Sequence, residues 1–267
     1  MPDELASLDG LIASAAETAI PVTDDGFIRG DGVFEVIRVY DGVPFALGDH
    51  LTRLERSTTN LRLGWSAPRA ELEKEVERLL EARGGRDFDG CLRIVLTRGG
   101  RRLLLTEQLP VAAEHARLAY VTFCPTRILD GVKSLSYAAN MLAGRIAKER
   151  GFDEALLVTP HGRVLEAPTS TLFWCAEDGT LATPPLDDHI LASITRAHVI
   201  ELTGAEERVC TQDDLRKASE AFLASTTREV QPVSAIEDVE LEAPGERTRE
   251  ARAALRARIQ EDLAAAG

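Results

Sequence analysis

One lysine stands apart from the other basic residues of the chain. Of the 31 lysines and arginines, four are lysines, and three of these, Lys74, Lys148 and Lys217, fall in polar segments typical of solvent-exposed helix faces. Lys133 instead lies among weakly polar neighbours in GVKSL, just before a segment with helical periodicity. A partly buried lysine can lose its proton and attack a carbonyl, which an arginine cannot do. Lys133 is therefore a candidate nucleophile, although an ordinary lysine at a strand end would give the same pattern.

Two hydroxyl-bearing segments could bind a phosphate group. The segment SIT, residues 193–195, begins a predicted helix, where backbone N–H groups and a hydroxyl favour an anion. The segment STT, residues 225–227, follows a predicted strand, but each pattern is also typical of helix capping or of a turn. Glu166 follows an apolar strand, where a carboxylate needs a partner such as a pyridinium N–H or an arginine. Together with Lys133, these features favour a phosphate-bearing aldehyde cofactor such as pyridoxal phosphate.

Composition excludes several other classes of function. The chain has 267 residues, 44% of them hydrophobic, and a formal net charge of −13, which disfavours binding to nucleic acid or to an anionic membrane. The four cysteines are scattered without a CxxC motif and the five histidines have no metal-ligand spacing, so we expect no disulfide framework and no metal site. The first ten residues do not resemble a signal peptide, and no apolar run reaches 18 residues. We therefore expect a cytoplasmic protein.

The elements that must position these residues alternate between strands and helices. Along the first part of the chain, the patterns predict a strand at 32–40, a hairpin through the DG at 41–42, helices at 49–63 and 69–82, and strands at 91–98 and 117–123.

The second part begins with the lysine segment. Apolar residues recur at Leu135, Ala139, Leu142 and Ile146, which predicts one buried face of a helix that Gly151 ends. Further on, the patterns predict a helix at 193–202 and a strand at 220–227 that ends in the hydroxyl-rich turn, and then a C-terminal helix. The chain is thus an α+β protein, for which we expect an N-terminal α/β domain at 1–121, a linker at 122–130 and a C-terminal domain at 131–267.

Six motifs follow one another over about residues 21–235 and read DDGFIRGDGVFEVIRVYDG, HLTRLERS, GVKSLSYAANMLA, GFDEALLVTPHGRVLEAPTSTLF, TPPLDDHILASITR and ASTTREVQPV. In this order they resemble the fold-type IV pyridoxal-phosphate enzymes, which include branched-chain aminotransferases, D-amino acid transaminases and aminodeoxychorismate lyases. The resemblance implies two domains, the smaller one N-terminal, with the cofactor between them. It also implies small-molecule amino-acid and keto-acid substrates and a homodimer.

The resemblance assigns roles residue by residue. It makes Lys133 the lysine that forms the aldimine with pyridoxal 5'-phosphate and Glu166 the partner of the pyridine nitrogen. It assigns Arg53, which the residues alone place on a solvated helix face, to the cofactor phosphate. It adds the phosphate or loop contacts Ile194, Thr195, Thr226 and Thr227.

The substrate-binding residues are harder to assign. The wording of the motifs is closer to the D-amino acid transaminases than to the branched-chain enzymes, but Phe34 stands where D-amino acid enzymes commonly have a tyrosine. Arg29 is a candidate clamp for a substrate carboxylate, and Arg98 is a second candidate. Arg29 could equally be a surface residue paired with Asp24, Asp25 or Asp31.

The predicted activity is transamination. We expect an amino group to move between an α-amino acid and an α-keto acid, with D-amino acids the first candidates and branched-chain L-amino acids the second. An aminodeoxychorismate lyase producing 4-aminobenzoate and pyruvate is the alternative, because it shares the scaffold and the cofactor. A regulatory protein that holds the cofactor without turnover is disfavoured, because the chain has both Lys133 and Glu166 and, in addition, several arginines that could bind substrate.

Overall fold

The computed structural model describes residues 4–265, which divide into two compact units. The first unit contains the described residues up to Pro110, the segment Gly131–Tyr137 and the residues from Asp262 onward. The second unit contains Val111–Asp130 and Ala138–Glu261. This division differs from the predicted boundaries at 1–121, 122–130 and 131–267. Strand β7 (Ala116–Thr122) belongs to the sheet of the second unit, and the segment that carries Lys133 belongs to the first.

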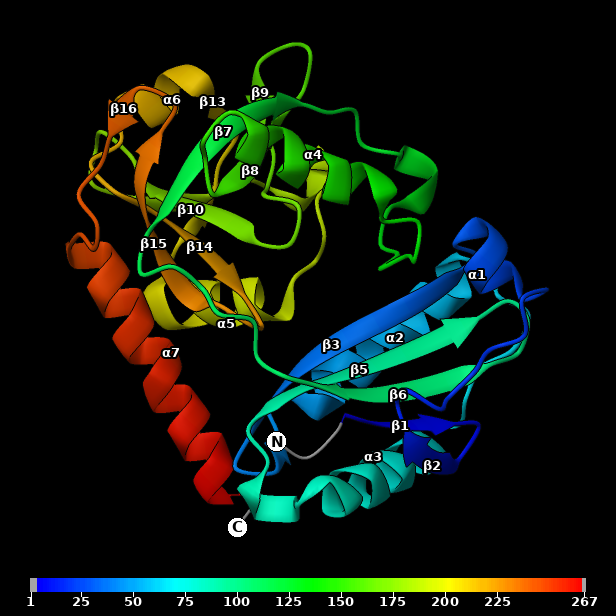
Figure 1. The fold of residues 1–267 in the computed structure, drawn as a ribbon. Helices are drawn as coiled ribbons and strands as arrows, with labels where there is room; N and C mark the ends of the chain where they lie inside the picture. Colours follow the sequence, from blue (N-terminus) through cyan, green and yellow to red (C-terminus); the bar gives the residue numbers. More distant parts are fainter. Residues whose placement is uncertain (1–3, 266–267) are drawn as a thin grey trace. The chain divides into compact units, whose positions relative to one another are not determined.

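An antiparallel sheet of six strands, counted over the described residues, forms the first unit, with the strand order β2-β1-β6-β5-β3-β4 (Figure 1). The strands are β1 (Leu5–Leu8), β2 (Leu11–Ser14), β3 (Gly32–Tyr40), β4 (Val43–Pro44), β5 (Gly90–Thr97) and β6 (Arg102–Glu107). Helices α2 (Leu47–Asn60) and α3 (Arg69–Arg83) cover one face of this sheet, and the short helix α1 (Asp25–Arg29) precedes β3.

Alternation along β3 determines what lies under the helices. Val33, Ile37 and Val39 are buried in the same apolar core as residues of α2, α3 and β5, so these odd-numbered positions face the helices. Glu35 shares their parity and is fully buried, and it therefore places a carboxylate inside an otherwise apolar layer. The even-numbered residues, among them Phe34 and Val36, lie on the opposite face of the sheet.

The predicted hairpin after β3 is confirmed. Tyr40 pairs with Val43 across the turn formed by Asp41 and Gly42, both of which have positive φ. Two positive φ values in a two-residue loop match the right-handed twist of the flanking strands, which explains the DG dipeptide.

The second unit is built on a mixed sheet. Its strand order is β12-β11-β10-β14-β15-β7-β8-β9-β13, and β16 pairs with β15 (Figure 1). The strands are β8 (Glu154–Val158), β9 (Arg163–Val164), β10 (Thr171–Cys175), β11 (Leu181–Thr183), β12 (Glu206–Glu207), β13 (Cys210–Thr211), β14 (Ala221–Ser225), β15 (Glu229–Ile236) and β16 (Val239–Glu240). The helices are α4 (Ala138–Glu149), α5 (Ile194–Thr203), α6 (Gln212–Arg216) and the part of α7 (Glu246–Ala265) that precedes Asp262. Helix α4 packs on β7 and β8, and α5 packs on β14.

The predicted buried face of the helix after Lys133 is wrong. Helix α4 begins at Ala138, and its buried residues are Ala143 and Ala147. Leu142 is 51% exposed, and Leu135 lies before the helix. The small side chains of Ala143 and Ala147 allow α4 to lie close to β7 and β8. The contact with the sheet, and not the positions of the larger apolar side chains, therefore determines which face of α4 is buried. Within residues 4–265, the structure contains no helix both long and apolar enough to cross a membrane.

Candidate active site

The backbone of Lys133 is fixed within the first unit. The segment Gly131–Tyr137 runs antiparallel to the start of β3, with a bridge between Val33 and Ser134. The N–H of Phe34 donates to the carbonyl of Lys133 at 3.0 Å, and the N–H of Leu135 donates to the carbonyl of Gly32 at 2.9 Å. These two hydrogen bonds fix the backbone from the Lys133 carbonyl to Leu135 against β3.

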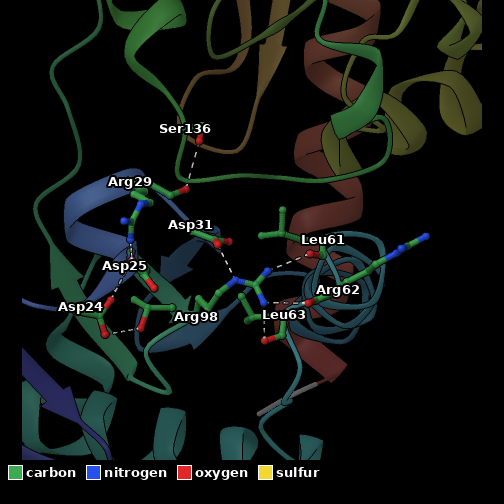
Figure 2. A network of polar contacts seen from close by, with 12 residues as sticks. Asp24, Asp25, Arg29, Asp31, Leu61, Arg62, Leu63, Arg98 and Ser136 are labelled. Carbon is green, nitrogen blue, oxygen red and sulfur yellow. Dashed lines mark hydrogen bonds and ion pairs between the residues drawn. The ribbon is translucent and has the colours of Figure 1, made fainter.

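Helix α2 and the loop before β3 add further contacts to this segment. The N–H of Lys133 donates to Ser57 Oγ at 3.1 Å, and Asn60 Nδ2 donates to the carbonyl of Gly131 at 3.4 Å. On the other side, Ser136 Oγ donates to the carbonyl of Gly30 at 3.2 Å, as Figure 2 shows. The position of the Lys133 backbone is thus set by β3, α2 and the α1–β3 loop together.

The Lys133 amine lies over an aromatic ring. Its Nζ is 4.5 Å from the centroid of the buried Phe34 ring. Tyr137 packs edge-on against the same ring, with 5.5 Å between the two ring centroids. A cation over an aromatic face is stabilised by the ring quadrupole, and the apolar ring also limits hydration of the amine. Lys133 is half-buried, which is the setting that the sequence predicted for a nucleophilic lysine.

A second cation contacts the same ring, and sequence reasoning did not select it. The Arg93 guanidinium carbon is 5.6 Å from the Phe34 centroid, and Arg93 Nε donates to Glu107 Oε2 at 2.9 Å. Arg93 pairs with Val36 in the β3–β5 register, so it shares the sheet face of Phe34. The alternation of the two strands could have revealed this placement once their register was known.

Arg53 is not on a solvated helix face. It is 6% exposed, and it donates from Nε to Glu35 Oε1 at 2.7 Å and from Nη2 to Glu35 Oε2 at 2.5 Å. His50 Nδ1 lies 2.8 Å from Glu35 Oε2, and both His50 and Glu35 are buried. Sequence reasoning missed Glu35 and His50. The signal for them was a glutamate at a core-facing position of β3, which requires a cation nearby.

Burial and pairing oppose each other in the pKa values of this cluster. Burial by itself would raise the pKa of Glu35, but the hydrogen bonds and charges of Arg53 and His50 outweigh it and lower that pKa to about 2. Burial lowers the pKa of His50, against the opposing effect of its hydrogen bond to Glu35. At neutral pH the cluster therefore contains an ionised glutamate, an arginine cation and a neutral histidine.

In the second unit, Glu166 is held by the segment that leads into α5. The N–H of Leu191 donates to Glu166 Oε1 at 3.1 Å, and the Glu166 carbonyl accepts from the N–H of Leu157 at 2.9 Å. Because an N–H donor stabilises a charged carboxylate, Glu166 is suited to face a protonated nitrogen. Its side chain is half-buried.

The two hydroxyl segments lie where the sequence predicted them. Ser193 is the N-cap of α5 and accepts from the N–H of Arg196, while Ile194 and the buried Thr195 form the first turn. Thr226 and Thr227 form the turn after β14 and are half-buried. Ser225 Oγ, at the end of β14, is buried and has no hydrogen-bond partner among residues 4–265. An orphaned buried hydroxyl beside this turn fits a polar ligand that is not part of the chain.

The two arginines proposed for the substrate have structural partners. Arg29 has a side chain that is 68% exposed and pairs with Asp25, which is the alternative interpretation of this residue (Figure 2). Arg98 pairs with Asp31 and donates to three consecutive backbone carbonyls that directly follow α2, those of Leu61, Arg62 and Leu63 (Figure 2). Arg98 thus connects the α1–β3 loop to α2, and the geometry supports a substrate role for neither arginine.

Comparisons with known proteins agree on one family. The sequence matches the family described as Amino-transferase class IV over residues 32–236. It is 31% identical to a D-alanine aminotransferase of Bacillus licheniformis, over 96% of this chain and 97% of that protein. It is 33% identical to a putative branched-chain-amino-acid aminotransferase of Methanocaldococcus jannaschii, over 86% of this chain and 87% of that protein.

A solved structure gives the same result for the fold. A fold IV transaminase from Curtobacterium pusillum superimposes with a TM-score of 0.86 at 30% identity, over 97% of this chain and 99% of that one. The α+β fold of type IV expected from the sequence is thereby confirmed. Class IV aminotransferases are pyridoxal-phosphate enzymes, and a lysine amine, an anion site at a helix N-terminus and a carboxylate are the groups that such a cofactor requires. The chain is therefore an enzyme of the class IV aminotransferase family.

Proposed function

We propose that this enzyme transfers an amino group between an α-amino acid and an α-keto acid, with Lys133 as the residue that binds pyridoxal 5'-phosphate covalently. The observation that carries the proposal is the Lys133 amine over the Phe34 ring, on a backbone segment fixed by β3 and α2. When bound, the cofactor supplies an electron-accepting ring. Lys133 then supplies the base that moves a proton at the substrate Cα, because its backbone is fixed while its long side chain can reorient.

The remaining anchors have separate tasks in this proposal. In the first unit, Arg53 is the ligand of the cofactor phosphate that the family resemblance assigns. In the second unit, the first turn of α5 and the Thr226–Thr227 turn are the assigned anion-binding elements. Glu166 binds the ring nitrogen and keeps it protonated, supported by the N–H of Leu191. Because the phosphate and the ring are both held, the reacting carbon is already oriented, which lowers the entropy cost of reaching the reactive geometry.

We assign the substrate carboxylate to Arg93 instead of Arg29 or Arg98. Arg93 and Lys133 both lie within 6 Å of the Phe34 ring centroid. Glu107 binds Arg93 through Nε, and the two Nη groups can form an end-on bidentate contact with a carboxylate. Phe34 itself offers no hydroxyl to a carboxylate, so an arginine on its sheet face is the group that supports recognition of amino acids.

We favour D-amino acids as donors and place branched-chain L-amino acids second. The D-type wording of the motifs supports this order, as does the match to the Bacillus licheniformis relative along almost the whole of both chains. The match to the Methanocaldococcus jannaschii relative supports the second choice. A homodimer and a cytoplasmic location stay predictions that accompany this assignment.

The proposal is tested by a donor panel, a pair of lysine variants and one arginine variant. D- and L-amino acids are assayed with pyruvate and 2-oxoglutarate as acceptors, and borohydride reduction followed by peptide mapping should label Lys133. Lys133→Ala should abolish labelling and exchange, whereas Lys148→Ala, a change of the same type on α4, should change neither. Label on another lysine would contradict the assignment.

Arg93 is tested through the carboxylate of the donor. Arg93→Leu should raise KM for amino acids at least about tenfold, the effect of losing a charge-assisted contact, and should spare a primary amine that lacks a carboxylate. Equal losses for both donors would return Arg93 to a structural role. Pyruvate release from aminodeoxychorismate without any amine exchange would assign the enzyme to the lyases.

A further inference from the structure

Glu35 is an unusual residue to find at the centre of β3. It is 0% exposed and lies between Val33 and Ile37, in a layer where an apolar side chain would pack without a desolvation cost. A buried ion pair gives little net stability compared with apolar residues of similar size, because two charges must leave water. Stability alone is therefore a weak account of the pairing between Glu35 and Arg53, and its geometry suggests another.

The pairing fixes one edge of the Arg53 guanidinium. Glu35 accepts from Nε and from Nη2, so both carboxylate oxygens lie along the same side of the planar fork. A bidentate contact restricts rotation of the long arginine side chain, which otherwise retains considerable rotamer freedom. The other N–H donors of the guanidinium lie on its remaining edges, and their directions follow from the orientation that Glu35 sets.

His50 fixes the carboxylate in turn. It lies on α2 one helical turn before Arg53, and its Nδ1 contacts Glu35 Oε2 at 2.8 Å. Glu35 Oε1 thus accepts from Arg53, and Glu35 Oε2 contacts both Arg53 and His50. The charges of Glu35 and Arg53 cancel, so an approaching anion must be recognised through directed hydrogen bonds instead of through net charge.

We propose that Glu35 is a positioning residue that holds the Arg53 guanidinium in the orientation that receives the cofactor phosphate, with His50 fixing Glu35. The inference rests on the proposed role of Arg53 as a phosphate ligand and adds that this role depends on Glu35. Glu35 does not touch the cofactor in this account and acts through Arg53 alone.

The inference can be separated from simple electrostatics by the sign of one effect. If Glu35 acted only as a nearby negative charge, Glu35→Gln would strengthen the binding of a phosphate anion. If Glu35 orients Arg53, the same substitution weakens phosphate binding, because the amide provides one acceptor oxygen in place of two. The two accounts therefore predict opposite changes.

The experiment compares pyridoxal 5'-phosphate with pyridoxal, which carries the same aldehyde without the phosphate. Both are titrated into the cofactor-free enzyme by absorbance. Glu35→Gln should weaken pyridoxal 5'-phosphate about tenfold, as for the loss of roughly one charge-assisted hydrogen bond, and should change the affinity for pyridoxal less than about twofold. The matched control is Glu75→Gln, a fully buried glutamate of the same unit that pairs with Arg102, and it should leave both affinities unchanged.

A double variant shows whether Glu35 acts through Arg53. Glu35→Gln combined with Arg53→Ala should bind pyridoxal 5'-phosphate no more weakly than Arg53→Ala alone, whereas a general folding defect would add to the loss. If Glu35→Gln does not fold, Glu35→Asp provides a second variant, which keeps the charge but withdraws the carboxylate by one methylene. It should also weaken the binding of pyridoxal 5'-phosphate relative to that of pyridoxal.

Two results would overturn the inference in distinguishable ways. Unchanged or tighter binding of pyridoxal 5'-phosphate to the Glu35 variants, with weakened binding to Arg53→Ala, would reject the positioning role and leave Arg53 as the phosphate ligand. An unchanged ratio of the two affinities in Arg53→Ala would reject the phosphate role of Arg53 itself, and with it the basis of the inference.

Discussion

Acidification should destabilise the first unit through Glu35. The pKa of this carboxyl is about 2 in the folded protein against an ordinary value of 4.5, because the effects of Arg53 and His50 outweigh burial. A lowered folded-state pKa gives a stabilisation that is fully present above about pH 4.5 and is lost as the pH falls towards 2. The difference between the two pKa values corresponds to about 3 kcal/mol, of which about 2 kcal/mol is lost by pH 3.

His50 changes stability in the same direction at higher pH. Its pKa is lowered by burial, so the unfolded chain binds a proton at this residue before the folded protein does. Stability should therefore begin to fall as the pH drops below about 6.5, the ordinary value for histidine, and the Glu35 effect should follow below about 4.5. His50 should therefore account for the first loss of stability on acidification, and Glu35 for the loss at lower pH.

The two tryptophans lie in different units, so fluorescence can follow the pH dependence of the stability of the first unit separately. Trp65 reports on the first unit, where its Nε1 donates to the carbonyl of Thr97 at 2.8 Å, and Trp174 is buried in the second. In a Trp174→Phe background, urea unfolding followed by fluorescence between pH 7 and pH 2.5 gives the stability of the first unit. Glu35→Gln in this background should flatten the curve below pH 4.5. Equal slopes in both proteins would refute the reasoning.

The remaining predictions concern packing and turn geometry. Leu54→Ala, at a fully buried position of α2, should cost about 2–5 kcal/mol, whereas Leu142→Ala, at the exposed position of α4, should stay within about 0.5 kcal/mol, as urea unfolding of both variants would show. A large loss for Leu142→Ala would contradict the orientation of α4. Gly42→Ala should cost at least about 1–3 kcal/mol, because Gly42 has a φ of +77° and a Cβ there would lie 2.3 Å from the carbonyl oxygen of Gly85. An unchanged midpoint would show that the hairpin can shift without loss.

Local chemistry made part of this fold predictable. The DG dipeptide at 41–42 predicted the hairpin because the residues favour positive φ, and the SIT segment at 193–195 predicted the start of α5 because a hydroxyl there can accept an N–H, as Ser193 does. The predicted helix at 69–82 corresponds to α3, whose apolar positions recur with the helical period. In each case the determining contacts lie within a few residues along the chain.

The features that were missed depend on contacts between distant segments. Glu35 and Arg53 are 18 residues apart, and their pairing requires α2 to lie on β3. Arg93 shares the face of Phe34 only in the β3–β5 register, which no local pattern provides. The division of the chain followed the same rule, because residues 131–137 belong to the first unit through hydrogen bonds to β3.

The scarcity of lysine in the chain is consistent with this arrangement. Arg53 and Arg98 are each held at several atoms, by a carboxylate in one case and by a carboxylate and three carbonyls in the other. A planar guanidinium suits such fixed contacts, whereas an ammonium on a flexible stem does not. At Lys133 hydrogen bonds hold the backbone, and the long side chain ends over the Phe34 ring. A group that must form a covalent bond, leave it and then carry a proton needs a flexible stem and an amine that can lose its proton, so the proposed chemistry requires a lysine at this position.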